Sequence, residues 1–211
     1  MTDRVKYPRT MHLPWSPGVQ NDDRVIKTLA QLDGEQVVVT EKLDGENTTL
    51  YRDGLHARSA DGRHHPSRDW VKRFWGENQW RIPPDTRICG ENLYAQHSVA
   101  YDNLETYFYA FGVWSAGECL SWNDTEVLLK EYGITPVPVL WQGTFSESNM
   151  QRIADAMDFE QQEGYVVRLA RSFKHYEFPS VVAKYVREGH VQTDKHWMHS
   201  EIIPNKLAER G

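Results

Sequence analysis

The stretch EKLDGEN, residues 41–47, gives the first indication of both the fold and the chemistry of this sequence. It follows a β-branched run at residues 37–40, which predicts a strand ending at Lys42. A nucleophilic lysine must be deprotonated, so its pKa has to fall from about 10.4, as partial burial and nearby cations favour. Gly45 would let a phosphate approach the backbone. Taken alone, a solvated lysine before an Asp-Gly turn is the simpler interpretation.

Further along the chain, charged and aromatic residues lie in or beside predicted strands. They are Arg58 after a hairpin strand, Glu91 in CGEN, Phe111 in YAFGVW, Glu163 in EGYVVR and Lys184 in VVAKYV. Charged groups at such positions are typical of a cleft between sheets rather than of a solvated surface. Each of three residues has an alternative interpretation without a role in chemistry at that position. Phe111 would pack in the core, Glu163 would only cap a turn, and Arg58 would be a surface residue with Arg63 as the actual contact. Glu91 has no such packing use.

Apolar periodicity and turn residues predict the remaining elements. Helices are expected from Asp22 or Asp23 to about Leu32, over 67–80 opened by Ser67, over 124–133 ending at Gly133, and over 146–157. Strands are expected over 87–94, 106–114, 163–169 and 180–186. A hairpin is expected around Asp53-Gly54, and residues 1–20 are expected to form an extended arm. Strands and helices mix without strict alternation. This predicts an α+β domain with mainly antiparallel sheets.

Composition narrows the class of protein. A formal net charge of −6 argues against bulk electrostatic coating of nucleic acid, so any nucleic acid would meet a local basic groove. Two cysteines do not form a disulfide framework, and there is no apolar leader or membrane-length apolar run. A cytoplasmic protein without membrane contact is expected.

The order of these motifs resembles that of the covalent nucleotidyltransferases, the superfamily of ATP-dependent ligases and capping enzymes. KLDG is similar to motif I, CGEN to motif III, YAFGVW to motif IIIa, EGYVVR to motif IV and VVAKYV to motif V. The likeness covers residues 36–187 and is greatest to the RNA ligase 2 family. It implies the ATP-grasp-like adenylation fold of DNA and RNA ligases, with helices flanking the sheets around a nucleotide cleft.

The resemblance also implies roles for single residues. Lys42 would attack ATP to form lysyl-AMP, Glu91 would accept hydrogen bonds from the ribose, and Phe111 would stack on the purine. Arg58 would bind phosphate or sugar, and Lys184 would bind the α-phosphate. Glu163 would hold Mg²⁺ or Mn²⁺ together with Glu91. Glu41 and Asn47 are carried over as an adenine-side contact and an end-joining contact.

The chain departs from the family pattern in three places. Motif V has Val186 where a second lysine is usual, so Lys184 acts alone or Arg187 or Lys174 substitutes. Gly112 follows Phe111 in place of an Asp. The stretch after Lys184 is too short for an OB fold, so a single domain over 1–211 with a tail from 188 is expected, with a separate accessory protein as one way to replace the missing part.

A local basic patch is the candidate surface for nucleic acid. It comprises Arg63, His64, His65, Arg68, Lys72, Arg73 and Arg187. A solvated helix face explains part of it equally well. The tail histidines lack the spacing of zinc ligands.

The resulting expectation is an ATP-dependent RNA ligase that joins a 5′-phosphate to a 3′-hydroxyl. A small DNA ligase and a GTP-using capping guanylyltransferase are the rivals within enzymes. A nucleotide-binding or nucleic-acid-binding module without chemistry is the rival of another class.

Overall fold

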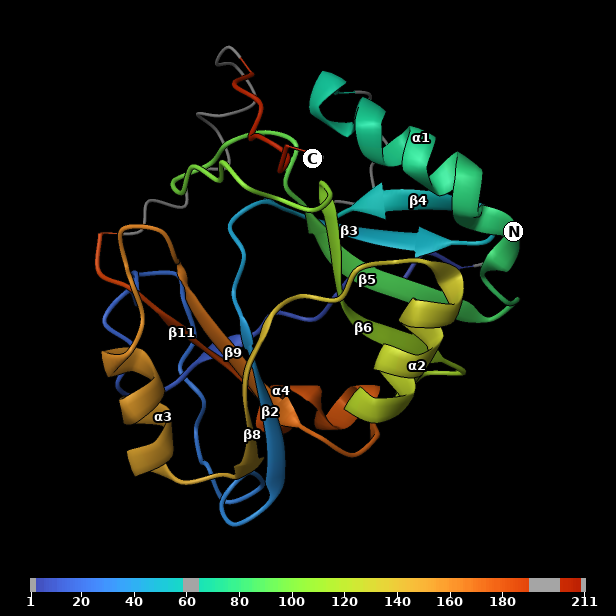
Figure 1. Cartoon of the computed structure of the whole chain (residues 1–211). Helices are drawn as coiled ribbons and strands as arrows, with labels where there is room; N and C mark the ends of the chain where they lie inside the picture. The colour runs from blue at the N-terminus through green and yellow to red at the C-terminus, as the bar shows by residue number, and fades with distance from the viewer. Residues whose placement is uncertain (1–2, 59–64, 190–201, 210–211) are drawn as a thin grey trace.

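The computed structural model describes residues 3–58, 65–189 and 202–209, and its two sheets form the two halves seen in Figure 1. A buried cluster joins them, because Cys89 and Trp114 of one sheet pack in the same core as Val167 and Ala183 of the other. The loops at the ends of the strands meet where the two sheets face each other.

The first sheet has the order β1-β11-β9-β2-β8. Its strands are β1 (Met11–His12), β2 (Gln36–Glu41), β8 (Val139–Thr144), β9 (Gly164–Leu169) and β11 (Val182–Val186). All pairs are antiparallel except β1 with β11. Helix α3 (Glu147–Asp155) packs on this sheet, where the Tyr165 hydroxyl donates to the Met150 carbonyl at 3.2 Å.

The second sheet is antiparallel throughout, in the order β10-β7-β6-β5-β3-β4. Its strands are β3 (Glu46–Tyr51), β4 (Gly54–Ala57), β5 (Thr86–Asn92), β6 (Phe108–Ser115), β7 (Glu118–Cys119) and β10 (Phe173–Lys174). Helices α1 (Asp69–Asn78) and α2 (Trp122–Tyr132) cover one of its faces, with Val71 and Leu129 packed in its core. The short helix α4 (Phe178–Val181) leads into β11.

The α+β class and most predicted elements are confirmed. The C-terminal end of α2 is confirmed, because Gly133 ends the helix at φ 69°. The helix begins at Trp122, two residues before the expected residue 124, and the Ser121 hydroxyl caps it by accepting from the Asp124 amide. The hairpin is also confirmed, although the turn lies one residue earlier than expected, at residues 52–53, because Gly54 already pairs with Tyr51. Helix α1 begins at Asp69, after a 3₁₀ turn (Pro66–Arg68) capped by His65.

The helix expected from Asp22 to Leu32 is wrong. This segment is irregular, and it lies alongside β1 through a bridge between His12 and Val25, with the Ile26 amide donating to the His12 carbonyl at 2.8 Å. Ile26 and Leu32 are buried in the core without a helix, so backbone pairing with β1 overrides helical periodicity. The expected N-terminal arm likewise contributes β1 to a sheet.

The C-terminal stretch 202–209 packs on the loop of residues 93–107. Bridges join Ala95 to Pro204 and Leu104 to Leu207. Asn205, which is 3% exposed, donates to the Leu93 carbonyl at 2.8 Å and accepts from the Tyr101 amide at 2.9 Å. The tail is therefore held by buried hydrogen bonds as well as by apolar contacts.

None of the helices in the described ranges has both the length and the apolar character of a membrane span.

Candidate active site

Lys42 and Glu163 form an ion pair where β2 ends and β9 begins. The Lys42 Nζ contacts Glu163 Oε2, and the Lys42 amide donates to the Gly164 carbonyl at 2.9 Å. The Glu163 side chain is fully buried, whereas that of Lys42 is 19% exposed. Two residues far apart in the sequence are thus brought together by the antiparallel pairing of β2 with β9. The alternative that Glu163 only caps a turn does not describe this arrangement.

Glu91 approaches the pair from the other sheet. It lies on β5, between Asn47 on β3 and Tyr109 on β6 in the strand register. Burial raises the pKa of Glu91 to about 8, an effect strengthened by Glu163 and opposed by the positive charge of Lys42. The carboxyl groups of Glu91 and Glu163 therefore act on the same lysine from opposite sheets.

Lys184 lies on β11, 8% exposed, opposite Val166 of β9 and His12 of β1. Burial lowers the pKa of Lys184, and the positive charge of Lys42 lowers it further. Asp23 opposes both effects, with its Oδ1 at 3.8 Å from Lys184 Nζ. The site thus contains two cationic amines near buried carboxyl groups.

The expected fall in the pKa of Lys42 is wrong for the free protein. Burial lowers the pKa of this ammonium group, but the negative charges of Glu163 and Glu91 outweigh burial and raise it above the ordinary value. Sequence reasoning weighed burial and cations but not carboxylates from distant strands. Lys42 is therefore held protonated, and attack requires that this field be offset.

The conformation of the Lys42 loop depends on residues that the sequence did not single out. The Asp44 carboxylate accepts hydrogen bonds from the Ser98 amide at 2.7 Å and the Val99 amide at 3.0 Å. The Tyr101 hydroxyl accepts from the Asp44 amide at 2.9 Å. The loop of residues 93–107 thereby fixes the turn after Lys42. The Asp of KLDG could have suggested a structural role, but nothing in the sequence identified its partners.

The other residues predicted for the nucleotide lie around this center. Phe111 is half-buried and packs against two hydrophobic clusters, where its ring meets the Tyr7 ring edge-on, with centroids 4.9 Å apart. Arg58 is exposed after β4, and its charge acts on Lys184. Burial raises the pKa of Glu41, and a hydrogen bond with Gln162 opposes this rise.

The predicted basic patch is only partly a surface. Arg68 is 7% exposed, and its guanidinium donates to both carboxylate oxygens of Glu46, so the expectation of an exposed phosphate contact is wrong. Lys72 lies on α1, 3.9 Å from Asp69. His65 contacts the Ser67 hydroxyl at 2.7 Å. Arg63, His64 and the tail histidines lie outside the described residues.

The two candidates for the missing second lysine of motif V differ in position. Lys174 pairs with Glu118 on the exposed edge formed by β10 and β7, so it does not substitute. Arg187 directly follows β11, and its amide donates to the Glu163 carbonyl at 3.0 Å. Of the two, Arg187 is therefore the one beside the site.

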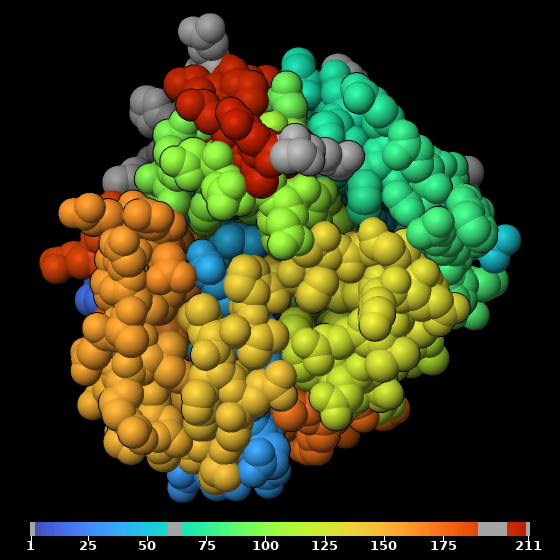
Figure 2. Space-filling model, in the orientation of Figure 1, coloured from blue at the N-terminus to red at the C-terminus, as the bar shows by residue number. Residues whose placement is uncertain are grey.

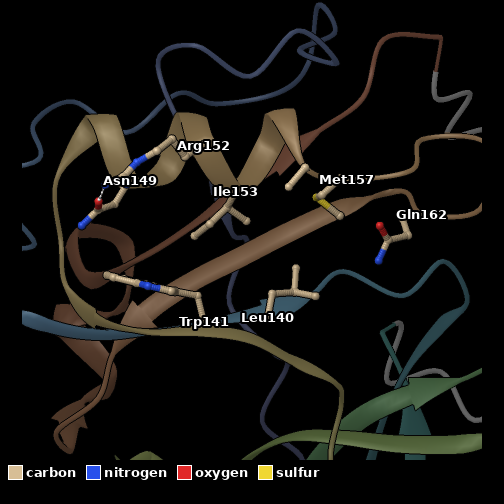
Figure 3. Close-up of a pocket in the computed structure, with 8 residues that line it drawn as sticks. Leu140, Trp141, Asn149, Arg152, Ile153, Met157 and Gln162 are labelled. Atoms are coloured by element: carbon tan, nitrogen blue, oxygen red, sulfur yellow. Dashed lines mark hydrogen bonds between the residues drawn. The ribbon is translucent and has the colours of Figure 1, made fainter.

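A groove of about 440 Å³ lies between α3 and β8, lined by Trp141, Leu140, Ile153 and Met157 (Figure 3). Gln162, at one end of it, directly precedes Glu163 and is the partner of Glu41. In Figure 2, blue atoms of the β2–β3 region are visible at the bottom of a depression between the orange, yellow and green segments.

Three solved structures resemble the fold. An archaeal ATP-dependent RNA ligase matches with a TM-score of 0.61 and 20% identity over 86% of this chain and 48% of its own. A Naegleria gruberi RNA ligase variant with ATP and Mn matches with a TM-score of 0.56 and 18% identity, over 86% of this chain and 57% of its own. A protein described as an ATP-dependent DNA ligase of Aquifex aeolicus matches with a TM-score of 0.54 and 22% identity, over 86% of this chain and 49% of its own.

The chain therefore spans about half the length of these proteins. No curated protein sequence matches it.

The sequence profile described as RNA ligase matches residues 35–186, a range that begins just before β2 and ends with β11. It contains Lys42, Glu91, Glu163 and Lys184, which the two sheets bring to one site. The chain therefore belongs to the RNA ligase family.

Proposed function

We propose that this chain is an ATP-dependent RNA ligase that works through a covalent lysyl-AMP on Lys42. The observation that carries the proposal is the ion pair between Lys42 and the fully buried Glu163, with Lys184 acting on it from β11 of the same sheet and Glu91 from β5 of the other sheet. The match to the RNA ligase family supports the same reaction class.

In the first step, Lys42 Nζ loses a proton and attacks the α-phosphorus of ATP. A nitrogen–phosphorus bond forms, the bond from the α-phosphorus to the bridging oxygen breaks, and pyrophosphate leaves. Glu163 Oε2 contacts Nζ and can accept its proton. Negative charge builds on the α-phosphate oxygens, and the Lys184 ammonium is placed to stabilise it. Glu91 and Phe111 are proposed to hold the ribose and the purine.

A divalent cation, Mg²⁺ or Mn²⁺, fits the donor set. Among the described residues, no group of three His, Cys, Asp or Glu side chains is arranged for a metal ion. Mg²⁺ is commonly held by one or two carboxylates together with substrate phosphates, and Glu163 and Glu91 supply such oxygens. When bound, the cation would neutralise phosphate charge and offset the carboxylate field that keeps Lys42 protonated.

In the later steps, AMP passes from Lys42 to the 5′-phosphate of an RNA end. The 3′-hydroxyl of a second end then attacks that phosphate, and AMP leaves. Asn47, next to Glu91 in the strand register, is proposed as an end-joining contact. Exposed Arg58 and half-buried Arg187 are proposed as contacts to the RNA backbone.

The test is incubation with α-labelled ATP or GTP and a divalent cation, followed by denaturing electrophoresis. Label from ATP, lost in Lys42→Ala and stable in Lys174→Ala, is the expected result. Lys174 is a matched control because it is also paired with a glutamate, but on the far edge of the other sheet. Label from GTP alone would indicate a capping reaction, and no label from either would leave a binding module.

The acceptor is tested separately, with matched RNA and DNA substrates that carry a 5′-phosphate. Sealing of RNA in preference to DNA is expected. Faster sealing of DNA would move the assignment to a DNA ligase.

A further inference from the structure

The N-terminal segment is folded against the backbone of Lys184. Strand β1 runs parallel to β11 with His12 opposite Lys184, and the Leu13 amide donates to the Lys184 carbonyl at 2.8 Å. On its other edge, the His12 amide donates to the Arg24 carbonyl at 2.7 Å. This arrangement brings residue 23 beside a cationic side chain of the proposed active site. Figure 1 shows β11 next to β9, with the blue N-terminal segment beyond it.

Asp23 lies between two side chains. Its Oδ1 is 3.8 Å from Lys184 Nζ, and its Oδ2 is 3.1 Å from His12 Nε2. The Gln20 amide also donates to Oδ2 at 3.2 Å. The Asp23 side chain is 15% exposed and that of His12 is 1% exposed, so both contacts lie largely away from solvent.

His12 is in turn connected to β11 through Ser16. His12 Nε2 lies close to the Asp23 carboxylate, although the two groups are not aligned as a hydrogen bond. The Ser16 hydroxyl lies 2.8 Å from Nδ1, and it accepts from the Val186 amide at 3.0 Å. The path from Asp23 through His12 and Ser16 thus ends on the strand that carries Lys184, which makes the position of the carboxylate rigid relative to that strand.

Lys184 needs such a contact. A lysine side chain has a flexible four-carbon stem and is readily deprotonated when buried. Here burial and the nearby Lys42 both favour its neutral form, whereas the carboxylates of Asp23 and Glu163 favour its charged form. Asp23 does so through an ion pair with Lys184. Within the described residues, Lys184 is also the only lysine of β11.

We propose that Asp23 is a positioning residue that orients and keeps charged the Lys184 ammonium, and that His12 fixes Asp23 for this task. The inference rests on the proposed function in one respect, because Lys184 is taken to stabilise the α-phosphate. Its geometric part, that Asp23 determines where Lys184 Nζ lies, does not depend on the reaction.

The experiment compares Asp23→Asn with Asp22→Asn, its exposed neighbour, by the single-turnover rate of labelling by ATP. Asp23→Asn is expected to slow the rate constant at saturating ATP about tenfold, equivalent to a coupling of ~1.4 kcal/mol. Asp22→Asn is expected to match the wild type, and Asp23→Glu to recover part of the rate. A double-mutant cycle with Lys184→Ala is the decisive control, because Asp23→Asn should have no further effect once Lys184 is gone.

Equal rates for Asp23→Asn and the wild type would overturn the inference. So would an equal loss in the Lys184→Ala background, which would indicate a general structural effect. A crystal structure of the full chain carrying Asp23→Asn tests the geometry without activity: Lys184 Nζ is expected to move from its wild-type position, and an unchanged, well-ordered Lys184 would refute the proposal. An unlabelled wild type would instead count against the proposed function, while the crystal structure would still decide whether Asp23 positions Lys184.

Discussion

Among single residues, the pair of Arg68 and Glu46 shows how a basic residue that looks suited to RNA is used inside the protein. Both side chains are about 10% exposed, and the guanidinium donates to both carboxylate oxygens of Glu46. Such a bidentate pair joins the 3₁₀ turn before α1 to the start of β3, close to the turn that carries Lys42. Its loss would leave a buried carboxylate without its main partner.

Arg68→Ala is therefore expected to lower the free energy of unfolding by about 3–5 kcal/mol, as when one member of a buried ion pair is removed. Arg73→Ala, on the exposed part of α1, is the matched control, with an expected change within about 0.5 kcal/mol. Urea denaturation of both variants measures the difference. A surface role for Arg68 would be indicated by two equally small changes.

His12 makes stability depend on pH. Burial, together with the positive charges of Lys184 and Lys42, lowers the pKa of His12 to about 4. The unfolded chain takes up a proton near pH 6.5, whereas the folded protein does not, so stability is lost as the pH falls between about 6.5 and 4. Unfolding free energies are expected to drop by about 1–2 kcal/mol from pH 7 to pH 5, and His12→Gln should remove that part of the slope. Parallel slopes in the two proteins would contradict this.

At the scale of elements, the pairing of β9 with β11 determines whether Glu163 and Lys184 can face the same substrate. Gly164 lies at the start of β9 opposite Val186, and a Cβ there would come within 2.0 Å of the Tyr185 carbonyl oxygen. That contact is shorter than any real carbon–oxygen approach, so the strands would have to separate.

Gly164→Ala is thus expected to destabilise the protein by more than about 1 kcal/mol and to reduce labelling of Lys42. Gly76→Ala, in α1 with open space around it, is expected to stabilise the protein by up to about 1 kcal/mol, because alanine is the better helix former. Thermal unfolding of the pair checks both signs.

The elements also show what the sequence could and could not predict. The end of α2 could be predicted because Gly133 is a local signal, and β9 and β11 could be predicted from their β-branched runs. The segment from Asp22 to Leu32 was misread because its partner, β1, lies elsewhere in the chain. The same reason explains the site: short motifs indicated Lys42, Glu91, Glu163 and Lys184, but the contacts of Asp23 and Asp44 come from distant segments without a local pattern.

For the whole molecule, the C-terminal stretch 202–209 is linked to the site through one loop. Asn205 bonds to residues of the 93–107 loop, and that loop in turn binds Asp44, two residues after Lys42. Asn205→Ala is expected to cost about 1–3 kcal/mol, because buried partners lose their hydrogen bonds. Hydrogen exchange should become faster at Ser98 and Val99, whereas amides of α3 serve as the internal control. Unchanged protection of the loop would refute the link.

The contact between Lys42 and Glu163 joins residues 121 positions apart, and β1 pairs with β11, the last strand within the described residues. During synthesis the ribosome releases Lys42 long before the residues that complete its surroundings. Because such distant pairings form late, an unfinished chain is expected to be inert toward ATP. A truncated translation product would then neither consume nucleotide nor become trapped as an adenylated fragment.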